Sequence, residues 1–457
     1  MSAETTQPID SDRETAAAAP PADSALRGRL ADAEQTIRRL LAEFESIEHA
    51  TGDAASDEAV EEAPPELSVV MPCLNEADTL ATCIEKAQRA MREANINGEV
   101  IVADNGSTDG SIEIGERLSA RVVHVTEKGY GAALMGGIEA ARGRYVIMGD
   151  ADDSYDFLEI PKFVDKLRAG HDLVQGCRLP WGGGRVLPGA MPALHRWWGN
   201  PMFTLMVRSM FGAPINDVYC GLRGFTRDLY NRLDLRCTGM EFATEMIIKS
   251  SLFGVDIAEA PTTLHPDGRK AHAPHLRTFR DGWRTLRFFL LYSPKWLFLV
   301  PGTLLCLIGL LGYGLAMPGA SIAGATLDAH TLLVASLALL LGHQALQFGA
   351  FAKTFAVSEG LLPESDLMRW FRKSVTLERC LFAGGGALAM ASVLLGTAVA
   401  QWRSVGFGEL DYATTMRWVI PGVTLATLGV QTTLSGFFLS VLRMSRRKAS
   451  PNSGRAS

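Results

Sequence analysis

The sequence predicts an α/β domain with a mostly parallel, Rossmann-like sheet, followed by an all-α membrane domain of four transmembrane helices. Between residues 67 and 275, short apolar runs alternate with amphipathic stretches, which is the pattern of βαβ units. After residue 290, four apolar stretches of 21 to 25 residues contain no Asp, Glu, Lys or Arg. Because about 20 apolar residues are enough to span a bilayer, each stretch predicts a membrane-spanning helix.

The first 66 residues differ from the rest of the chain in composition. They hold 16 Asp and Glu against 5 Lys and Arg, a balance of −11, whereas the whole chain carries −6, which leaves +5 for residues 67–457. We expect residues 1–66 to be a disordered acidic tail with one helix over 26–50. The mildly basic body suits anionic substrates and an anionic membrane surface, and its charge is too small to indicate nucleic-acid binding.

The elements of the α/β domain, residues 67–275, follow from the alternation of apolar and amphipathic segments. Strands are expected at 67–71, 99–103, 122–125 and 145–148. Helices are expected between them, at 78–94, 110–118 and 131–141. Ligands of such sheets bind at the carboxyl ends of the strands, so the polar residues that directly follow these strands are the candidates for function.

The seven cysteines carry no disulfide or zinc signature. They are scattered along the chain without a Cys-x-x-Cys pair, and such a set argues against a disulfide framework and against a zinc site. A reduced domain that faces the cytosol is therefore expected. The N-terminal stretch has no basic and apolar signal peptide, so membrane insertion is expected to depend on the internal apolar segments.

The membrane domain, residues 293–443, is predicted to have a defined orientation. Its spans are expected at 296–317, 331–352, 380–400 and 418–442. The connection 353–379 carries five Lys or Arg, whereas 318–330 carries none and 401–417 carries two. By the positive-inside rule, both termini, the basic tail 444–457 and the α/β domain lie in the cytoplasm. We therefore expect a multi-pass protein of the cell membrane (plasma or inner membrane).

Residues 276–292 predict an amphipathic helix between the two domains. One row of the helix holds the arginines Arg277, Arg280, Arg284 and Arg287, and a second row holds Phe279, Trp283, Leu286 and Leu290. At about 100° per residue, the centres of these rows lie roughly 110° apart. A basic row beside an aromatic row is typical of a helix in the headgroup plane, and the position directly before the first span favours this over an ordinary domain-surface helix.

The strongest chemical signal is the run Asp150-Ala151-Asp152-Asp153, which directly follows the apolar segment 145–148. Carboxylate oxygens suit Mg²⁺ or Mn²⁺, and such a metal completes its shell with substrate phosphates. The run therefore predicts a site for a diphosphate-containing molecule held through a divalent cation. Asp104 follows another strand and precedes a glycine turn, so it is positioned to accept hydrogen bonds from a nucleoside.

Taken in order, the motifs of the α/β domain resemble those of family 2 glycosyltransferases. The shared motifs are Pro72-Cys-Leu-Asn75-Glu76, Asp104-Asn-Gly-Ser-Thr-Asp109, Lys128-Gly-Tyr-Gly-Ala-Ala and Asp150-Ala-Asp152. The dolichol-phosphate (polyprenyl-phosphate) mannosyltransferase branch is resembled by Gly176-Cys-Arg178, Asp217-Val-Tyr-Cys-Gly221-Leu-Arg223 and Glu241-Phe-Ala-Thr-Glu245-Met. The resemblance spans residues 67–275 and implies a GT-A fold, a nucleotide-activated sugar as donor and a polyprenyl phosphate as acceptor.

The resemblance also implies roles for individual residues at the donor. The expected donor contacts are Pro72, Leu74, Glu76, Asp104, Lys128, Asp150, Ala151 and Asp152. Glu76 and Asp104 belong to the base and ribose region. Asp150 and Asp152 face the diphosphate and are the expected metal-binding residues for its Mg²⁺ or Mn²⁺, with Asp152 the foremost candidate for a direct ligand. Leu74 is a departure, because the family commonly has an aromatic residue there that stacks on the base.

The acceptor is expected to need arginines rather than a general base. A phosphate monoester oxygen is already anionic near neutral pH, since its second pKa is about 6. The protein must instead bring two anions together, which arginines do with bidentate geometry. The acceptor-phosphate candidates are Arg178, Arg196, Arg223, and Arg269 or Lys270 in place of the family's basic pair, which is shifted here. Arg178 is grouped with Asp150 and Asp152 as catalytic, with a surface salt bridge as its plain alternative.

These observations predict a membrane-bound inverting glycosyltransferase. It would move one sugar, of the mannose or glucose class, from a GDP- or UDP-linked donor to a polyprenyl phosphate at the cytoplasmic face. One alternative is a processive polysaccharide synthase, whose Gln-x-x-Arg-Trp motif is present only as a partial echo at Arg369-Trp370. Another is a non-catalytic, nucleotide-sensing membrane scaffold, against which the intact Asp104, Asp150 and Asp152 argue.

Overall fold

The computed structural model describes residues 35–40, 42, 64–269, 278–322 and 325–444. The chain divides into two compact units, Met1–Ala63 and Pro64–Ser457. In the first unit, residues 35–40 and 42 are helical and exposed, within the helix expected over 26–50. The remainder of that helix, the rest of the acidic tail up to residue 63 and nearly all of the basic tail 444–457 lie outside the described residues.

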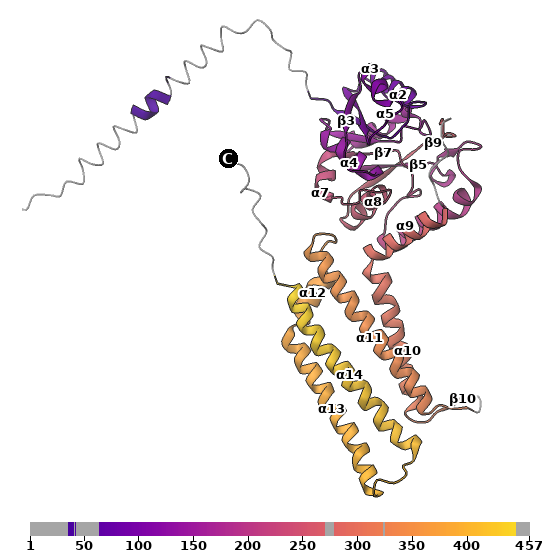
Figure 1. The fold of residues 1–457 in the computed structure, drawn as a ribbon, viewed down its shortest axis with the longest axis vertical. Helices are drawn as coiled ribbons and strands as arrows, with labels where there is room; N and C mark the ends of the chain where they lie inside the picture. The colour runs from indigo at the N-terminus through magenta and orange to yellow at the C-terminus, as the bar shows by residue number, and fades with distance from the viewer. Residues whose placement is uncertain (1–34, 41, 43–63, 270–277, 323–324, 445–457) are drawn as a thin grey trace, which may run out of the picture. The chain divides into compact units, whose positions relative to one another are not determined.

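The second unit begins with a seven-stranded sheet in the order β3-β2-β1-β4-β7-β5-β8 (Figure 1). The strands are β1 (Leu67–Cys73), β2 (Gly98–Asp104), β3 (Arg121–His124), β4 (Tyr145–Met148), β5 (Leu173–Cys177), β7 (Arg223–Thr226) and β8 (Ile257–Pro261). Strand β7 runs antiparallel to both of its neighbours, and all other pairs are parallel. The predicted mostly parallel α/β sheet is confirmed.

The parallel half of the sheet follows the expected alternation closely. Strand β4 has the expected bounds, and β1, β2 and β3 differ from the expected segments by one or two residues at an end. Alternate side chains of β1 enter different cores: Val69 packs into one cluster and Val70 into the other. Both are fully buried because helices cover both faces of the sheet, as is usual for parallel sheets.

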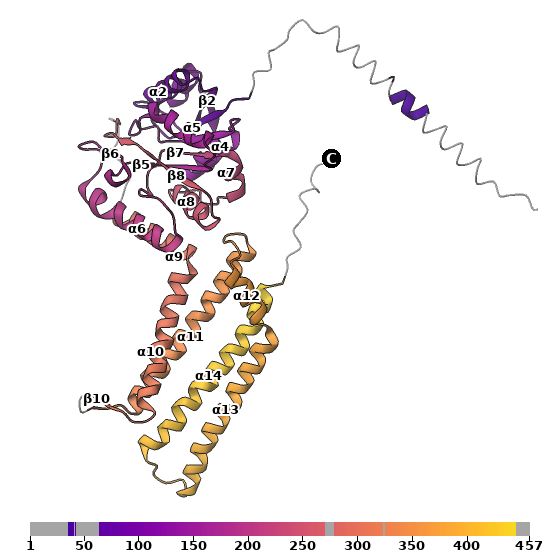
Figure 2. The same ribbon diagram turned by 180° about the vertical axis from the view of Figure 1, so that it is seen from behind.

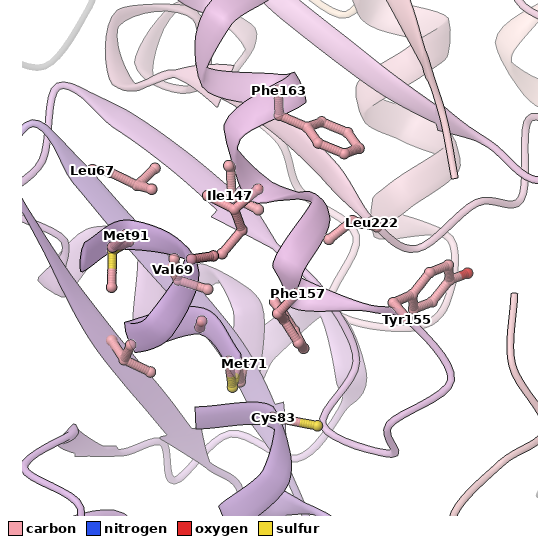
Figure 3. Packing of buried hydrophobic residues seen from close by; sticks show 14 of the residues in the cluster. Leu67, Val69, Met71, Cys83, Met91, Ile147, Tyr155, Phe157, Phe163 and Leu222 are labelled. Carbon is pink, nitrogen blue, oxygen red and sulfur yellow. The ribbon is translucent and has the colours of Figure 1, made fainter. Parts of the chain in front are cut away.

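The helices form one layer on each face of the sheet. One core contains residues of α2 (Leu80–Glu93) and α5 (Ile160–Arg168), and α3 (Ser111–Arg117) packs on α2. Figure 3 shows part of this cluster, in which Met71 of the sheet lies near Phe157 and Cys83, with Ile147 in the same cluster. The other core contains residues of α4 (Tyr130–Ala140), α6 (Asn200–Phe211), α7 (Arg227–Leu233) and α8 (Phe242–Leu252).

Helix α9 (Thr278–Tyr292) occupies most of the segment predicted to be an interfacial helix. Its Phe288 and Phe289 are buried in the core beside α6, where the Phe289 ring meets the Phe203 ring edge-on at 6.0 Å. Trp283 remains 63% exposed on the opposite side. The helix therefore packs one face against the α/β domain and leaves a Trp-bearing face free, and its placement in the headgroup plane stays a prediction.

Within the described ranges, four helices are long and apolar enough to cross a membrane (Figure 2). They are Lys295–Ala316 (η4 and α10), α11 (Ala329–Ser358), α13 (Leu377–Ser404) and α14 (Tyr412–Leu442). All four expected spans lie almost entirely within these helices, which mostly extend beyond them because the flanking polar residues continue the helical turns. The membrane domain of four helices is thus confirmed.

Close backbone approach holds these helices in two packed pairs, α10 with α11 and α13 with α14. A Cβ added at Gly309 would lie 2.7 Å from the Ala335 carbonyl oxygen of the facing helix. A Cβ added at Gly384 would lie 2.8 Å from the Gly429 carbonyl oxygen. Small residues at helix contacts are the usual basis of packing in membranes, where apolar surface alone gives little driving force between helices.

Candidate active site

The carboxyl ends of β1, β2 and β4 bring the predicted donor residues to one edge of the sheet. The register pairs Cys73 of β1 with Asp104 of β2, and Val70 of β1 with Met148 of β4. The residues that follow these strand ends, including Glu76 and Asp150, therefore lie along the same edge. This is the edge at which parallel sheets bind ligands.

Asp104 is oriented by its own glycine turn. Its Oδ2 accepts the Gly106 N–H at 3.1 Å and its Oδ1 accepts the Ser107 N–H at 2.9 Å. Burial opposes ionisation of Asp104, but the hydrogen bonds from Ser107, Gly106 and His124 outweigh it and hold the pKa of the carboxyl below its usual value. Gly106 has a φ of 98°, a conformation that favours glycine, so the turn depends on this residue.

Glu76 and Asp152 share one cation, Arg269. The Arg269 Nε lies 3.0 and 2.8 Å from the two Glu76 carboxylate oxygens, and its Nη2 lies 2.5 Å from Oε1. Its Nη1 lies 3.3 Å from Asp152 Oδ2 and 3.0 Å from Asp267 Oδ2. The structure therefore places Arg269, an expected acceptor residue, among the donor-site carboxylates. Lys270, its expected neighbour in that role, lies outside the described residues.

Asp150 is positioned by Tyr130, whose hydroxyl donates a hydrogen bond of 2.8 Å to Asp150 Oδ1. Burial and the nearby Asp152 charge raise the pKa of Asp150 to about 6. The backbone of Gly221 passes so close that an added Cβ would lie 2.7 Å from Asp150 Oδ2. The Asp150 carboxylate therefore lies between the Tyr130 hydroxyl, which bonds to one oxygen, and the Gly221 backbone, which packs against the other.

Asp152 and Asp153 face different partners although they are adjacent in the chain. Asp152 Oδ1 accepts hydrogen bonds from the Ser154 N–H at 3.0 Å and the Ser154 hydroxyl at 2.6 Å. Asp153 instead pairs with Lys86 of α2 at 2.7 Å. The carbonyl of Ala151, which stands between Asp150 and Asp152, accepts the Thr79 hydroxyl at 2.7 Å, and this bond fixes the run to the start of α2.

The remaining expected donor residues lie around the same edge. Lys128 donates from Nζ to the Asn105 carbonyl at 2.6 Å, and the side chain of Asn105 accepts the Gly129 N–H at 2.9 Å. Pro72 lies within β1, and Leu74, directly after this strand, is 48% exposed. An exposed aliphatic side chain at that position offers apolar contact to a ligand, without the stacking of an aromatic ring.

The carboxylate pair Asp150 and Asp152 fits a divalent cation that arrives with a diphosphate. Among the described residues, no group of three or more His, Cys, Asp or Glu is arranged to hold a metal by itself. Mg²⁺ in phosphate-transfer sites commonly binds one or two carboxylates and takes its other ligands from substrate phosphates and water. Burial and, second to it, the charge of Asp152 raise the pKa of Asp150, and a bound cation would relieve this repulsion between the two carboxylates.

Arg178 forms a buried ion pair instead of an open anion site. Its Nε and Nη2 bond to the two Asp217 carboxylate oxygens at 2.7 and 2.9 Å, and its Nη1 lies 3.4 Å from the Tyr155 hydroxyl. The side chains of Arg178 and Asp217 are 8% and 0% exposed. The expected plain alternative for Arg178 was a salt bridge at the surface, whereas the structure shows one in the interior.

Arg223 and Arg196, the other expected acceptor arginines, lie in contrasting surroundings. Arg223 is 0% exposed, and its guanidinium donates to the carbonyls of Ala243 and Cys220, so no acceptor can touch it in this conformation. Arg196 is only partly buried and lies over the Trp197 ring at 5.2 Å. Its Nε is shielded from solvent and has no hydrogen-bond partner among the residues that the structure describes.

Three supporting residues of the site received no role from the sequence: Tyr130, Tyr155 and Asp217. Tyr130 and Asp217 stand inside recognised motifs, but neither motif says which charge its side chain contacts. Tyr155 follows the acidic run and accepts the Gly221 N–H at 2.7 Å. The signal that finds them is geometric, because each bonds to a residue at least 20 positions away.

Comparisons with known proteins match both the α/β domain and the membrane domain. Residues 68–234 match the family Glycosyl transferase family 2, and residues 350–443 match the Glycosyltransferase family 2 C-terminal transmembrane region. The low-salt glycan biosynthesis hexosyltransferase Agl6 of Haloferax volcanii is 38% identical over 396 residues, which are 86% of this chain and 93% of that protein. A dolichyl-phosphate hexose transferase of the same organism is 31% identical over 197 residues, 43% of this chain and 81% of that protein.

Comparison with solved structures gives matches at low identity. One is glucosyl-3-phosphoglycerate synthase from Mycobacterium tuberculosis in complex with Mn²⁺, uridine diphosphate and glucosyl-3-phosphoglycerate. It is 21% identical with a TM-score of 0.38, and the match covers 50% of this chain and 78% of that one.

Proposed function

Since the chain belongs to glycosyltransferase family 2, we propose that it moves a single hexose from a nucleotide-sugar donor to a polyprenyl phosphate at the cytoplasmic face of the membrane. That it is a membrane-bound glycosyltransferase follows from the family and from its C-terminal transmembrane region. The polyprenyl phosphate acceptor is supported by the dolichyl-phosphate hexose transferase among its relatives. The mannose or glucose class of the sugar, and inversion at its anomeric carbon, follow from the motif resemblance.

The observation that carries this proposal is the set of carboxylates at the carboxyl ends of β1, β2 and β4. Asp104 is ionised and turned by its own loop, as a ribose or base ligand must be. Asp150 and Asp152 stand two residues apart at the end of β4, where a diphosphate would be bound. Among the residues that the structure describes, Asp150 forms no ion pair, and Asp152 Oδ2 lies 3.3 Å from the Arg269 guanidinium.

In the proposed reaction, Asp150 and Asp152 hold a divalent cation against the donor diphosphate. When bound, Mg²⁺ or Mn²⁺ supplies Lewis-acid stabilisation of the charge that develops on the leaving nucleoside diphosphate. Tyr130 keeps the Asp150 carboxylate in place through its hydroxyl. Arg269 adds positive charge beside Asp152 and Glu76, and so helps to balance the site before the donor arrives.

The acceptor needs a cation rather than a base. A phosphate monoester carries nearly two negative charges near neutral pH and can attack the anomeric carbon without losing a proton in the step. Arg196 is a partly exposed arginine of the expected acceptor set, and it lies beside the exposed Trp197 and Trp198. Lys270 remains a sequence-based candidate for the same task. Arg178 is buried and would support the site indirectly: the Tyr155 hydroxyl accepts hydrogen bonds from both the Arg178 guanidinium and the Gly221 N–H.

The proposed orientation puts the α/β domain in the cytoplasm. If all four candidate helices cross, the α/β domain, the connection between α11 and α13, and the residues after α14 share one side. The connection from 353 to 379 holds five Lys or Arg, so the positive-inside rule makes that side cytoplasmic. The exposed Trp283 face of α9 would then meet the headgroups next to the first span.

The test is a transfer assay with membranes that contain the full-length protein. They are incubated with a panel of radiolabelled GDP- and UDP-sugars, Mg²⁺ or Mn²⁺, and a short polyprenyl phosphate, and label is counted in the organic phase. Metal-dependent organic label from one donor supports the proposal and names the sugar. Label only in a water-soluble polymer would mean a processive synthase, and absence of label from every donor would contradict the proposed reaction.

A further inference from the structure

Glu245 is a buried carboxylate that none of the proposed chemistry uses. It lies on α8 and is 0% exposed. Its Oε2 accepts the backbone N–H groups of Arg236 and Cys237 at 2.9 and 2.8 Å, and its Oε1 accepts the Tyr292 hydroxyl at 2.6 Å. Burial opposes its ionisation, but these hydrogen bonds and the charge of Lys249 outweigh it, so the pKa of Glu245 lies below its usual value.

The backbone segment whose amides bond to Glu245 packs directly against the glycine turn before α4. The Ala132 N–H donates to the Thr238 carbonyl at 3.0 Å. A Cβ added at Gly129 would lie 2.3 Å from the Thr238 carbonyl oxygen, and one added at Gly131 would lie 2.5 Å from the Cys237 carbonyl oxygen. The turn thus rests directly on the carbonyls of residues 237–239, and a shift of that segment must move the turn.

Between those two glycines stands Tyr130, the residue that bonds to Asp150 at 2.8 Å. Tyr130 is the first residue of α4, so its ring follows the backbone of the turn. The segment held by Glu245 therefore determines where the Tyr130 hydroxyl lies. Through that hydroxyl it determines where one of the two proposed metal-binding carboxylates lies.

The other side of Glu245 contacts the helix that leads into the membrane. Tyr292 is the last residue of α9, and the first candidate span begins at Lys295, three residues later. Four residues before Glu245, Glu241 forms an ion pair with Arg284 of the same helix α9. Two acidic residues at the start of α8 thus attach α9 to the segment that supports the glycine turn.

We propose that Glu245 and Tyr292 are positioning residues that join the last turn of α9, next to the membrane, to the Asp150 carboxylate. Contact runs from the Tyr292 hydroxyl to Glu245, to the Arg236 and Cys237 amides, to the carbonyls under the glycine turn, and through Tyr130 to Asp150. The proposal rests on the proposed function only in taking Asp150 as a metal ligand. If it holds, the geometry of the donor site depends on how α9 packs against the α/β domain.

A purely structural role for Glu245 is the rival explanation. Lys249 lies 3.0 Å from Glu245 Oε1 and donates to the carbonyls of Leu233 and Asp234, so the pair also ties α8 to the end of α7. Replacing Glu245 would leave a buried ammonium without its counter-charge and would destabilise the whole domain. Tyr292→Phe avoids this problem, because it keeps the ring that packs on Phe288 at 4.7 Å and removes only the hydroxyl.

The experiment compares the full-length wild type with Tyr292→Phe in lipid nanodiscs, with Tyr230→Phe as the matched control. Tyr230 lies in the same domain and stacks on Phe225. Mn²⁺ affinity is measured in the presence of a nucleoside diphosphate at one fixed concentration, from the electron paramagnetic resonance signal of free Mn²⁺, and hydrogen exchange is followed at the Ala132 amide. Removing the direct partner of a metal ligand costs about 10- to 100-fold in affinity, so we expect about a three- to tenfold loss for this more remote hydroxyl.

The proposal predicts weaker Mn²⁺ binding and faster Ala132 exchange in Tyr292→Phe, with Tyr230→Phe unchanged and with the acceptor KM of the transfer assay unaffected. Combining Tyr292→Phe with Tyr130→Phe should add little to the loss caused by Tyr130→Phe alone, because both act through one hydroxyl. Wild-type Mn²⁺ affinity and wild-type exchange in Tyr292→Phe would overturn the proposal, and so would additive losses. Normal Mn²⁺ binding without sugar transfer in the wild type would reject the proposed function and leave this linkage standing.

Discussion

The two halves of the catalytic sheet treat charge in opposite ways. At the ends of β1, β2 and β4, the carboxylates of Asp104, Asp150 and Asp152 are held mainly by turns, hydroxyls and backbone amides. Around β5 and β7, Arg178 is bound to the fully buried Asp217, and Arg223 is sealed among carbonyls. The carboxylates of the first half can therefore still bind a ligand, whereas the arginines of the second half are already bound to groups of the protein itself.

It follows that a charged residue in a recognised motif need not touch the substrate. Removing a carboxylate from the first half should reduce activity and leave the fold intact, because its partners there are backbone amides and hydroxyls, or Arg269, which keeps Glu76 as a partner. Removing one from the second half should unfold the protein, because the partner left behind is buried without compensation.

Asp217→Asn should be the most damaging substitution. It leaves the Arg178 guanidinium buried without a counter-charge, which typically costs about 3–5 kcal/mol of stability. The measurement is denaturant or thermal unfolding of the purified protein in detergent. The matched control is Asp256→Asn, which removes the pairing of His171 with a carboxylate that is 70% exposed and should change stability far less. Equal stability of the two variants would remove the distinction between the halves.

Gly221→Ala should impair catalysis more than folding. The new methyl carbon would lie 2.7 Å from Asp150 Oδ2 and about 3.1 Å from the Tyr155 ring, so the carboxylate must shift. Displacing a catalytic group in this way should lower kcat/KM about 10- to 100-fold. Gly314→Ala, whose added methyl would meet nothing within 4 Å, serves as the control. Near-wild-type transfer by Gly221→Ala would show that the position of Asp150 is not critical.

Tyr130→Phe should weaken metal binding with little loss of stability. It removes the hydrogen bond of 2.8 Å that orients Asp150 and keeps the ring in place. The loss of a partner that orients a metal ligand costs about 10- to 100-fold in metal affinity, and we expect the lower end because Asp152 remains. The metal concentration for half-maximal transfer reports the effect. An unchanged requirement for metal would exclude Tyr130 from the site.

Asp153→Asn should have the smallest effect. Asp153 directly follows the proposed metal ligand Asp152, but its carboxylate pairs with Lys86, and both side chains are 28% exposed. A pair this accessible to water contributes at most about 1 kcal/mol to stability, and its loss should leave transfer rates within about twofold of the wild type. A large loss of activity would mean that Asp153 shares the metal site.

The sequence predicts the first half of the sheet better than the second, for physical reasons. Strands β1 to β4 are short apolar runs separated by amphipathic helices, so periodicity reveals them. Strand β7 is antiparallel, has four residues and begins with the charged Arg223, so it carries no apolar run to detect. The four membrane helices are evident because no other element needs about 20 uncharged residues in succession.

The candidate site shows the same limit. The residue types of the acidic run and of Asp104 predict a donor site, and the strand order brings them together. The ion-pair partners of the arginines cannot be predicted in this way. The sequence does not tell that Arg178 pairs with Asp217 or that Arg269 pairs with Glu76, 193 positions away. Burial decides whether an arginine binds a ligand or an internal carboxylate, and burial of single polar residues is a property of the tertiary fold.

The most direct test of the account is metal-dependent transfer by wild type, Asp152→Asn and Asp153→Asn, with label counted in polyprenyl-linked sugar. Losing a ligand that supports Lewis-acid stabilisation worth several kcal/mol should lower transfer by Asp152→Asn at least about 100-fold, with an unfolding temperature like that of the wild type. Asp153→Asn should transfer normally. Robust transfer by Asp152→Asn in the presence of Mg²⁺ or Mn²⁺ would contradict the assignment of the acidic run as the metal site.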